Sequence, residues 1–61
     1  MSYIVKLPRK SGDAFISDFD GMNEDATNAY VFETQDDAEA ACDRAEEVGL
    51  LGDREPVIME I

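Results

Sequence analysis

The 61-residue sequence contains no histidine and a single cysteine. Without histidine, the chain lacks the commonest general base, the commonest metal ligand and the base of most serine and cysteine triads. One cysteine cannot close an internal disulfide, and it is too few for a structural zinc site. We therefore expect a binding protein with no catalytic residue, no metal and no cofactor, rather than an enzyme.

Long apolar runs are also missing. No run reaches the roughly 18 apolar residues that a transmembrane helix needs. The first residues lack the basic-then-apolar pattern of a secretory signal peptide. A chain without disulfides suits a reducing compartment. We therefore predict a cytoplasmic protein that makes no contact with membranes.

Basic residues are scarce, and the few present are unevenly placed. The chain has 5 bases against 15 acids, a net charge of −10. Lys6, Arg9 and Lys10 lie in the first ten residues, which contain no acid; the other 51 residues hold all 15 acids and two bases, a balance of −13. Such a surface repels nucleic acid and attracts basic protein surfaces. We therefore predict a basic, nucleic-acid-binding protein or complex as the partner, and no direct contact with nucleic acid.

Length and hydrophobic content indicate one small domain, residues 1–61. A chain of this size buries only about 60% of the surface that it exposes when unfolded. Its hydrophobic content of 44% is ordinary for a folded protein. Such a domain has marginal stability and little concave surface for a buried catalytic site.

The stretch 34–49, TQDDAEAACDRAEEVG, predicts an amphipathic helix over residues 34–48. Thr34 is a suitable N-cap, because its hydroxyl accepts from a free backbone N–H of the first turn. Gly49 suits the left-handed residue that ends a helix. Apolar residues at spacings of three and four share one face, and we interpret Cys42 as part of it. The predicted buried face consists of Ala38, Ala41, Cys42, Ala45 and Val48.

Short stretches of alternating or β-branched and aromatic residues predict four strands, at residues 2–7, 14–19, 29–32 and 57–61. Residues 20–28 are polar and form the longest predicted loop. The order β-β-β-α-β favours an α+β fold with two layers: a four-stranded, mainly antiparallel sheet and one helix packed on one face. We expect the strand order 3-2-1-4, with the last strand parallel to the first.

Residues 18–25 contain the acidic pattern D-x-D-G-x-N-E-D. Clustered oxygens of this kind are typical of calcium loops, but an EF-hand needs glycine at its sixth position and glutamate at its twelfth. Here Gly21 is fourth and the twelfth residue is Ala29. A solvated acidic loop is the favoured interpretation, and we expect calcium to have no effect on the fold.

The water-facing side of the predicted helix is strongly acidic. Carboxylates at spacings of three and four lie about 5–6 Å apart and cost a few tenths of a kcal/mol per pair. Glu46 and Glu47 also lie at the C-terminal end, where the helix dipole disfavours negative charge. Because this arrangement weakens the fold, we interpret it as a partner-binding surface. Its candidate residues are Asp36, Glu39, Asp43, Glu46 and Glu47 of the helix, with Asp20, Glu24 and Asp25 of the loop.

Three explanations of this acidic surface remain open. It can keep a small protein soluble, it can adapt the protein to high salt, or it can mimic nucleic acid. Duplex DNA presents one negative charge per ~1.7 Å of axis, and a rigid acidic helix of similar charge density would dock in a basic channel. The attraction would be long-ranged and fast, as an inhibitor requires.

A very small, single-domain, cysteine-poor and strongly acidic α/β chain resembles phage-encoded inhibitors of host defence, above all the anti-CRISPR proteins that act as DNA mimics. The resemblance is one of profile: length, charge and the stretch DDAEAACDRAEE, residues 36–47. It implies an inhibitor that blocks the DNA-binding surface of a CRISPR surveillance complex in the host cytoplasm. The basic stretch KLPRK, residues 6–10, departs from a pure mimic and leaves room for a second contact. The alternative is an acidic protein-interaction domain without inhibitory role, from a high-salt organism.

Overall fold

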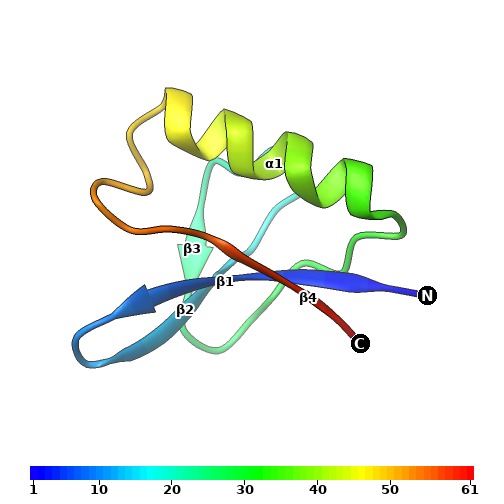
Figure 1. Cartoon of the computed structure of the whole chain (residues 1–61). Helices are drawn as coiled ribbons and strands as arrows, with labels where there is room; N and C mark the ends of the chain where they lie inside the picture. The colour runs from blue at the N-terminus through cyan, green and yellow to red at the C-terminus, as the bar shows by residue number, and fades with distance from the viewer.

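The computed structural model describes all 61 residues and contains four strands and one helix. The elements are β1 (Tyr3–Arg9), β2 (Gly12–Ile16), β3 (Glu24–Asp25), α1 (Gln35–Glu47) and β4 (Val57–Glu60). The strands form one sheet in the order β3-β2-β1-β4, and α1 packs on one face of it (Figure 1). The predicted two-layer α+β fold is confirmed, and the strand order 3-2-1-4 is the predicted one, although a different segment forms the third strand.

The third strand lies earlier in the chain than predicted. β3 falls inside the predicted 20–28 loop and pairs antiparallel with β2. The predicted strand at 29–32 is wrong: Phe32 forms an isolated bridge with Tyr3 of β1, and the Tyr30 N–H donates to Ile16 O at 2.9 Å, but the segment forms no strand. In that bridge the Tyr3 N–H donates to Phe32 O at 2.9 Å, and the Phe32 N–H donates to Tyr3 O at 2.8 Å. The segment therefore occupies the place beside β1 that lies beyond the end of β2.

The direction of the last strand also differs from the prediction. β4 pairs antiparallel with β1, with Val57 opposite Lys6 and Glu60 opposite Tyr3, so the predicted parallel pairing is wrong. The chain reverses once more than predicted, between β3 and Phe32. As a result α1 runs in the same sense as β1 and β4 returns in the opposite sense, which Figure 1 shows.

β1 continues through Pro8 to Arg9, whereas the sequence predicts that proline ends the strand. Arg9 opposes Gly12 across the hairpin and Pro8 opposes Asp13. Because hydrogen bonding alternates along an antiparallel pair, the position of Pro8 directs its missing N–H away from β2. On that side β4 reaches only as far as Lys6, so no ladder bond is lost.

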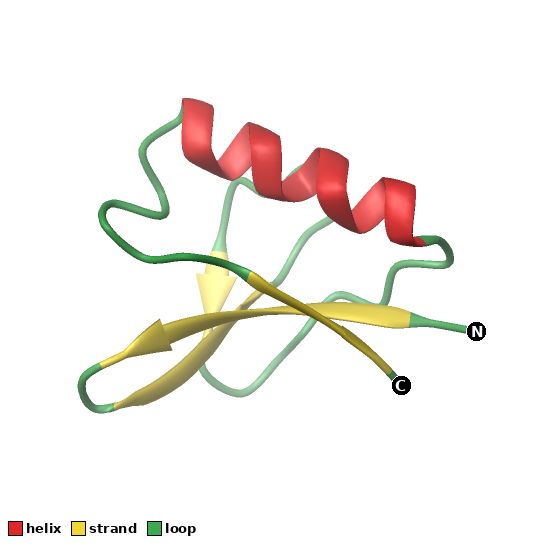
Figure 2. Ribbon diagram, viewed as in Figure 1, coloured by secondary structure: helices red, strands yellow, loops and turns green.

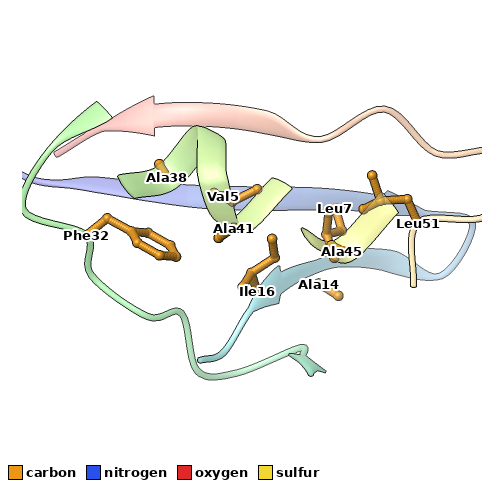
Figure 3. Packing of buried hydrophobic residues seen from close by; sticks show 9 residues of the cluster. All are labelled: Val5, Leu7, Ala14, Ile16, Phe32, Ala38, Ala41, Ala45 and Leu51. Atoms are coloured by element: carbon orange, nitrogen blue, oxygen red, sulfur yellow. The ribbon is translucent and has the colours of Figure 1, made fainter. Parts of the chain in front are cut away.

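The core lies between α1 and the sheet, where side chains from both layers point into a common interior (Figure 3). Alanine is the only residue that α1 buries, and this small side chain brings the helix close to the sheet. Val48, predicted on the same face, is 49% exposed because it is the C-cap, where the helix has ended. The buried hydrophobic residues are Val5, Leu7, Ala14, Ile16, Phe32, Ala38, Ala41, Ala45 and Leu51.

Both ends of α1 are capped as predicted. The hydroxyl of Thr34 accepts from the Asp37 N–H at 3.1 Å. At the other end Gly49 has φ +80°, and its N–H donates to Glu46 O at 3.1 Å. The Leu50 N–H donates to Ala45 O at 2.9 Å. This pair of bonds is the Schellman arrangement, which satisfies the last carbonyls of a helix.

Candidate partner-binding surface

The buried alanines determine which side of α1 faces water. Each residue turns the helix by about 100°, so Asp36, Asp43 and Glu47 lie nearly opposite the buried side, and Glu39 and Glu46 lie beside them. All five are exposed. Their sector covers about 100° of the circumference and about 17 Å of the axis. We call this surface the acidic face; it consists of Asp36, Glu39, Asp43, Glu46 and Glu47.

The acidic face has no internal partner. The structure contains two ion pairs, Lys6 with Asp13 at 3.8 Å and Arg54 with Glu24 at 2.8 Å, and neither involves the face. Arg44 is the only base of α1 and lies outside the acidic sector. The five carboxylates are therefore available to water, to cations or to a basic partner.

Glu24 of the predicted site is held inside the molecule. Arg54 donates to both of its oxygens, from Nη1 at 2.9 Å and from Nη2 at 2.8 Å. Arg54 also donates to the carbonyls of Leu51 at 3.0 Å and Leu50 at 2.6 Å. The side-chain hydrogen bond from Arg54 lowers the pKa of Glu24. Glu24 therefore fastens β3 to the loop after α1, a role that no local pattern in the sequence indicates.

Asp25, also in the predicted site, closes a turn. It accepts from the Thr27 N–H at 2.8 Å, the Thr27 hydroxyl at 2.9 Å and the Asn28 N–H at 3.3 Å. The bond from the Thr27 backbone is the main cause of the lowered pKa of Asp25. This Asx turn reverses the chain after β3. Asp20, by contrast, is exposed and accepts no hydrogen bond; it lies beside the middle of α1, because the neighbouring Gly21 packs against the backbone of Ala41.

The calcium-like stretch is closed by its own hydrogen bonds. Asp18 accepts from the Met22 N–H at 2.8 Å and from Asn23 Nδ2 at 2.9 Å. Partial burial raises the pKa of Asp18, but these bonds outweigh it, and the pKa is lowered. No group of three acids, histidines or cysteines in the structure is placed to hold a metal ion.

Cys42 lies at the edge of the core, half-buried and packed against it. Burial raises the pKa of its thiol, and the charges of Asp43 and Glu39 raise it further. The nucleophilic form of cysteine is the thiolate. Cys42 therefore remains a protonated, unreactive thiol at neutral pH, in keeping with its predicted packing role.

The basic stretch 6–10, which leaves room for a second contact, lies at the hairpin end of the sheet. Pro8, Arg9, Lys10 and Arg54 line an open depression there. Arg9 and Lys10 are exposed and belong to no ion pair. The protein therefore carries an acidic face on α1 and a smaller cationic area on the sheet.

We predict that Glu24→Gln destabilises the fold by about 1–2 kcal/mol. This is the usual contribution of a hydrogen bond between charged groups, reduced because about a quarter of each side chain is exposed to solvent. The pKa of Glu24 is lower in the folded state than in the unfolded state. The stabilisation by the Arg54–Glu24 pair is therefore fully present above the pKa of an unfolded glutamate, about 4.3. This stabilisation is lost as the pH falls through the pKa of Glu24 in the folded protein.

Urea unfolding at neutral pH and at about pH 3 measures this contribution. Glu33→Gln, at an exposed acid without a hydrogen-bond partner, is the matched control for the change in net charge. The gap between the two variants should be present at neutral pH and shrink in acid. Equal stability of the two variants at neutral pH would show that the Arg54 clamp contributes nothing.

The structure holds no helix that combines the length and the apolar character needed to cross a bilayer. No protein-family model, curated protein or solved structure matches the chain, so its function is inferred from its own residues.

Proposed function

We propose that the protein is a non-enzymatic inhibitor that mimics the charge pattern of nucleic acid and blocks the DNA-binding surface of a CRISPR-type host defence complex. The observation that carries the proposal is the acidic face: five exposed, unpaired carboxylates on one helix. They follow one another at about 4 Å of helix axis per charge. Phosphates along one strand of duplex DNA are spaced at about 3.4 Å. Because such complexes work inside the host cell, the proposed place of action is the host cytoplasm.

The acidic face is ordered before binding. Buried alanines and two caps fix α1 against the sheet, so little conformational entropy is lost when a partner docks. Repulsion between neighbouring carboxylates weakens the free helix by a few tenths of a kcal/mol per pair. A basic channel would relieve this repulsion, and the arrangement that weakens the fold therefore strengthens the complex.

The loop acids have a smaller role in this proposal. Asp20 is exposed beside α1 and can contact the partner directly. Glu24 and Asp25 use their oxygens within the molecule, so they add to the long-range field and not to the contact. Each acid–base pair that is desolvated at the interface should contribute about 1.5–3 kcal/mol. Pairs at the rim should mainly raise the association rate.

The test is a charge-reversal series, Asp36→Lys, Glu39→Lys and Asp43→Lys, made singly and together. We expect the triple variant to remain folded, because these side chains are exposed and form no ion pair within the molecule. Binding to a CRISPR surveillance complex and competition with its target DNA should be lost. The measurement is displacement of labelled DNA from the complex. The matched control is Glu33→Lys, Asp53→Lys and Glu55→Lys, which changes the net charge equally at exposed positions outside α1.

Two results would contradict the proposal. One is a triple variant that displaces DNA as well as the parent protein. The other is a control variant that loses as much activity, because the effect would then belong to the net charge and not to the acidic face. Binding to a basic protein without displacement of DNA would support the alternative, an interaction domain without inhibitory role. Adaptation to high salt predicts that the fold itself fails in dilute buffer and recovers in molar salt.

A further inference from the structure

The two edges of the sheet are built differently. The β3 edge has two residues, both acidic, and one of them is clamped by Arg54. Short, charged strands of this kind prevent pairing with other chains. The β4 edge, Val57–Glu60, has the sequence VIME, with no lysine or proline inside it, and it pairs only with β1. Its outer side is open to a further strand.

The backbone groups that face this open side follow from the pairing with β1. The backbone N–H and C=O of Tyr3 are hydrogen-bonded to Phe32, on the side away from β4. The opposing Glu60 therefore directs its own N–H and C=O outward. The Ile61 N–H donates inward, to Ser2 O at 2.8 Å, as this alternation requires. By the same alternation Ile58 also points its backbone groups outward.

Exposed apolar side chains lie beside this edge. Figure 2 shows that α1 covers one face of the sheet and that no element covers the other. On the uncovered face Met59 lies opposite Ile4, and Val57 lies opposite Lys6. Val57 is 43% exposed and Met59 is 38% exposed. Exposed apolar side chains next to unpaired backbone groups mark this edge as a surface for association.

We propose that β4 pairs antiparallel with β4 of a second copy of the chain, about a two-fold axis at Met59. Ile58 of each copy then faces Glu60 of the other, and about four backbone hydrogen bonds join the copies. In this register every outward N–H of the two residues is used. Pairing Ile58 with Ile58 would instead set Glu60 against Pro56, which has no N–H. The outer faces of the two sheets become continuous across the interface.

The choice of a second copy as the partner of β4 rests on the proposed function. One acidic face has the charge spacing of one DNA strand, whereas a duplex presents two antiparallel rows. α1 contacts β1 and β4, so in the paired sheet the two helices lie on the same face and run in opposite directions. They are separated by about two to three strand spacings, roughly 10–14 Å. A second copy therefore completes a two-row acidic surface that one copy lacks.

Net charge opposes this association and gives it a distinctive salt dependence. Each copy carries a charge of −10, and the repulsion is screened beyond ~8 Å at physiological ionic strength. Added salt should therefore strengthen pairing between copies. A basic strand from another protein would respond in the opposite way, because its attraction to this chain would be screened.

The experiment is sedimentation velocity on the protein alone, from about 10 µM to about 1 mM, which covers weak dimers. We expect the mean mass to rise toward that of a dimer with concentration. The dissociation constant should fall at least about threefold when sodium chloride is raised to about 0.5 M. A monomer at every concentration and salt level would overturn the proposal, and so would association that weakens with salt.

Two variants locate the interface. Glu60→Pro removes an outward N–H that the β1–β4 ladder does not use, and we expect at least about tenfold weaker dimerisation. Glu60→Gln keeps this N–H and is the matched control, with dimerisation retained. Met59→Lys places like charges opposite each other at the axis although it makes the chain less negative, so lost dimerisation cannot come from net charge. If Glu60→Pro does not fold, dimerisation of Met59→Lys provides the test of the interface. Folded variants that dimerise like the parent would overturn the proposal.

Dimerisation and inhibition are measured separately, so their failures can be told apart. If the parent is monomeric but still displaces DNA through the acidic face, the dimer proposal is wrong and the proposed function stands. If the parent dimerises through β4 but the charge-reversal triple variant still inhibits, the proposed function is wrong and the dimer stands, without its role in mimicry.

Discussion

Gly21→Ala is expected to destabilise the domain by about 2–5 kcal/mol, from backbone strain and overpacking together. Gly21 has φ +73°, and a Cβ built on it would lie 2.2 Å from the carbonyl oxygen of Ala41 and 2.9 Å from its carbonyl carbon. Both atoms belong to the backbone of α1, so they cannot move aside as a flexible side chain would. Small domains have only a few kcal/mol of stability, and most of it would be lost.

The measurement is urea unfolding followed by circular dichroism. Gly52→Ala is the matched control, because Gly52 also has a positive φ, +59°, but an added Cβ would meet nothing within 4 Å. The control carries only the strain of an L residue in the left-handed region, about 1–2 kcal/mol. Equal losses in the two variants would show that the loop does not pack against α1 as closely as the structure indicates.

Phe32→Ala should cost about 3–5 kcal/mol, the usual range for removing a buried phenylalanine. Phe32 is fully buried, and its ring centroid lies 4.9 Å from that of Tyr30 and 6.2 Å from that of Phe19. Loss of the ring leaves a cavity between α1 and the sheet, next to the bridge that ties residue 32 to Tyr3. We expect a protein that is largely unfolded at room temperature.

The control for this second variant comes from the same aromatic cluster. Phe19 is 52% exposed, so Phe19→Ala removes an equal ring with less loss of burial and should cost clearly less. Thermal melting of both variants and of the parent provides the comparison. A Phe32→Ala protein as stable as Phe19→Ala would mean that the segment before α1 is not part of the core.

The helix could be predicted because its signals are local. Thr34 and Gly49 lie next to the ends that they cap, and the buried alanines recur with the period of the helix itself. The same period identifies the acidic face as one surface. Each of these inferences needs only neighbours within about one or two helical turns.

The features that the sequence did not reveal depend on distant or ambiguous partners. Glu24 and Arg54 are 30 residues apart, and no spacing rule relates them. Asp25 begins an Asx turn, but a polar stretch that reverses the chain has the same composition as a solvated loop. This missed reversal led to the wrong direction for β4. Pro8 looked like the end of a strand because its cost depends on which side of the ladder its missing N–H would face.

The pairing of β4 with β1 has a consequence for how the chain folds. The central strand β1 finds one neighbour in the adjacent hairpin, but the other neighbour, β4, is more than fifty residues away, with Tyr3 opposite Glu60. Contacts of such large sequence separation slow folding, because the loop must close before the contact forms. During synthesis the sheet cannot be completed until residue 60 has left the ribosome. α1 is made before β4, so at first it can pack only against the hairpin and the segment that precedes the helix, which includes Gly21 and Phe32.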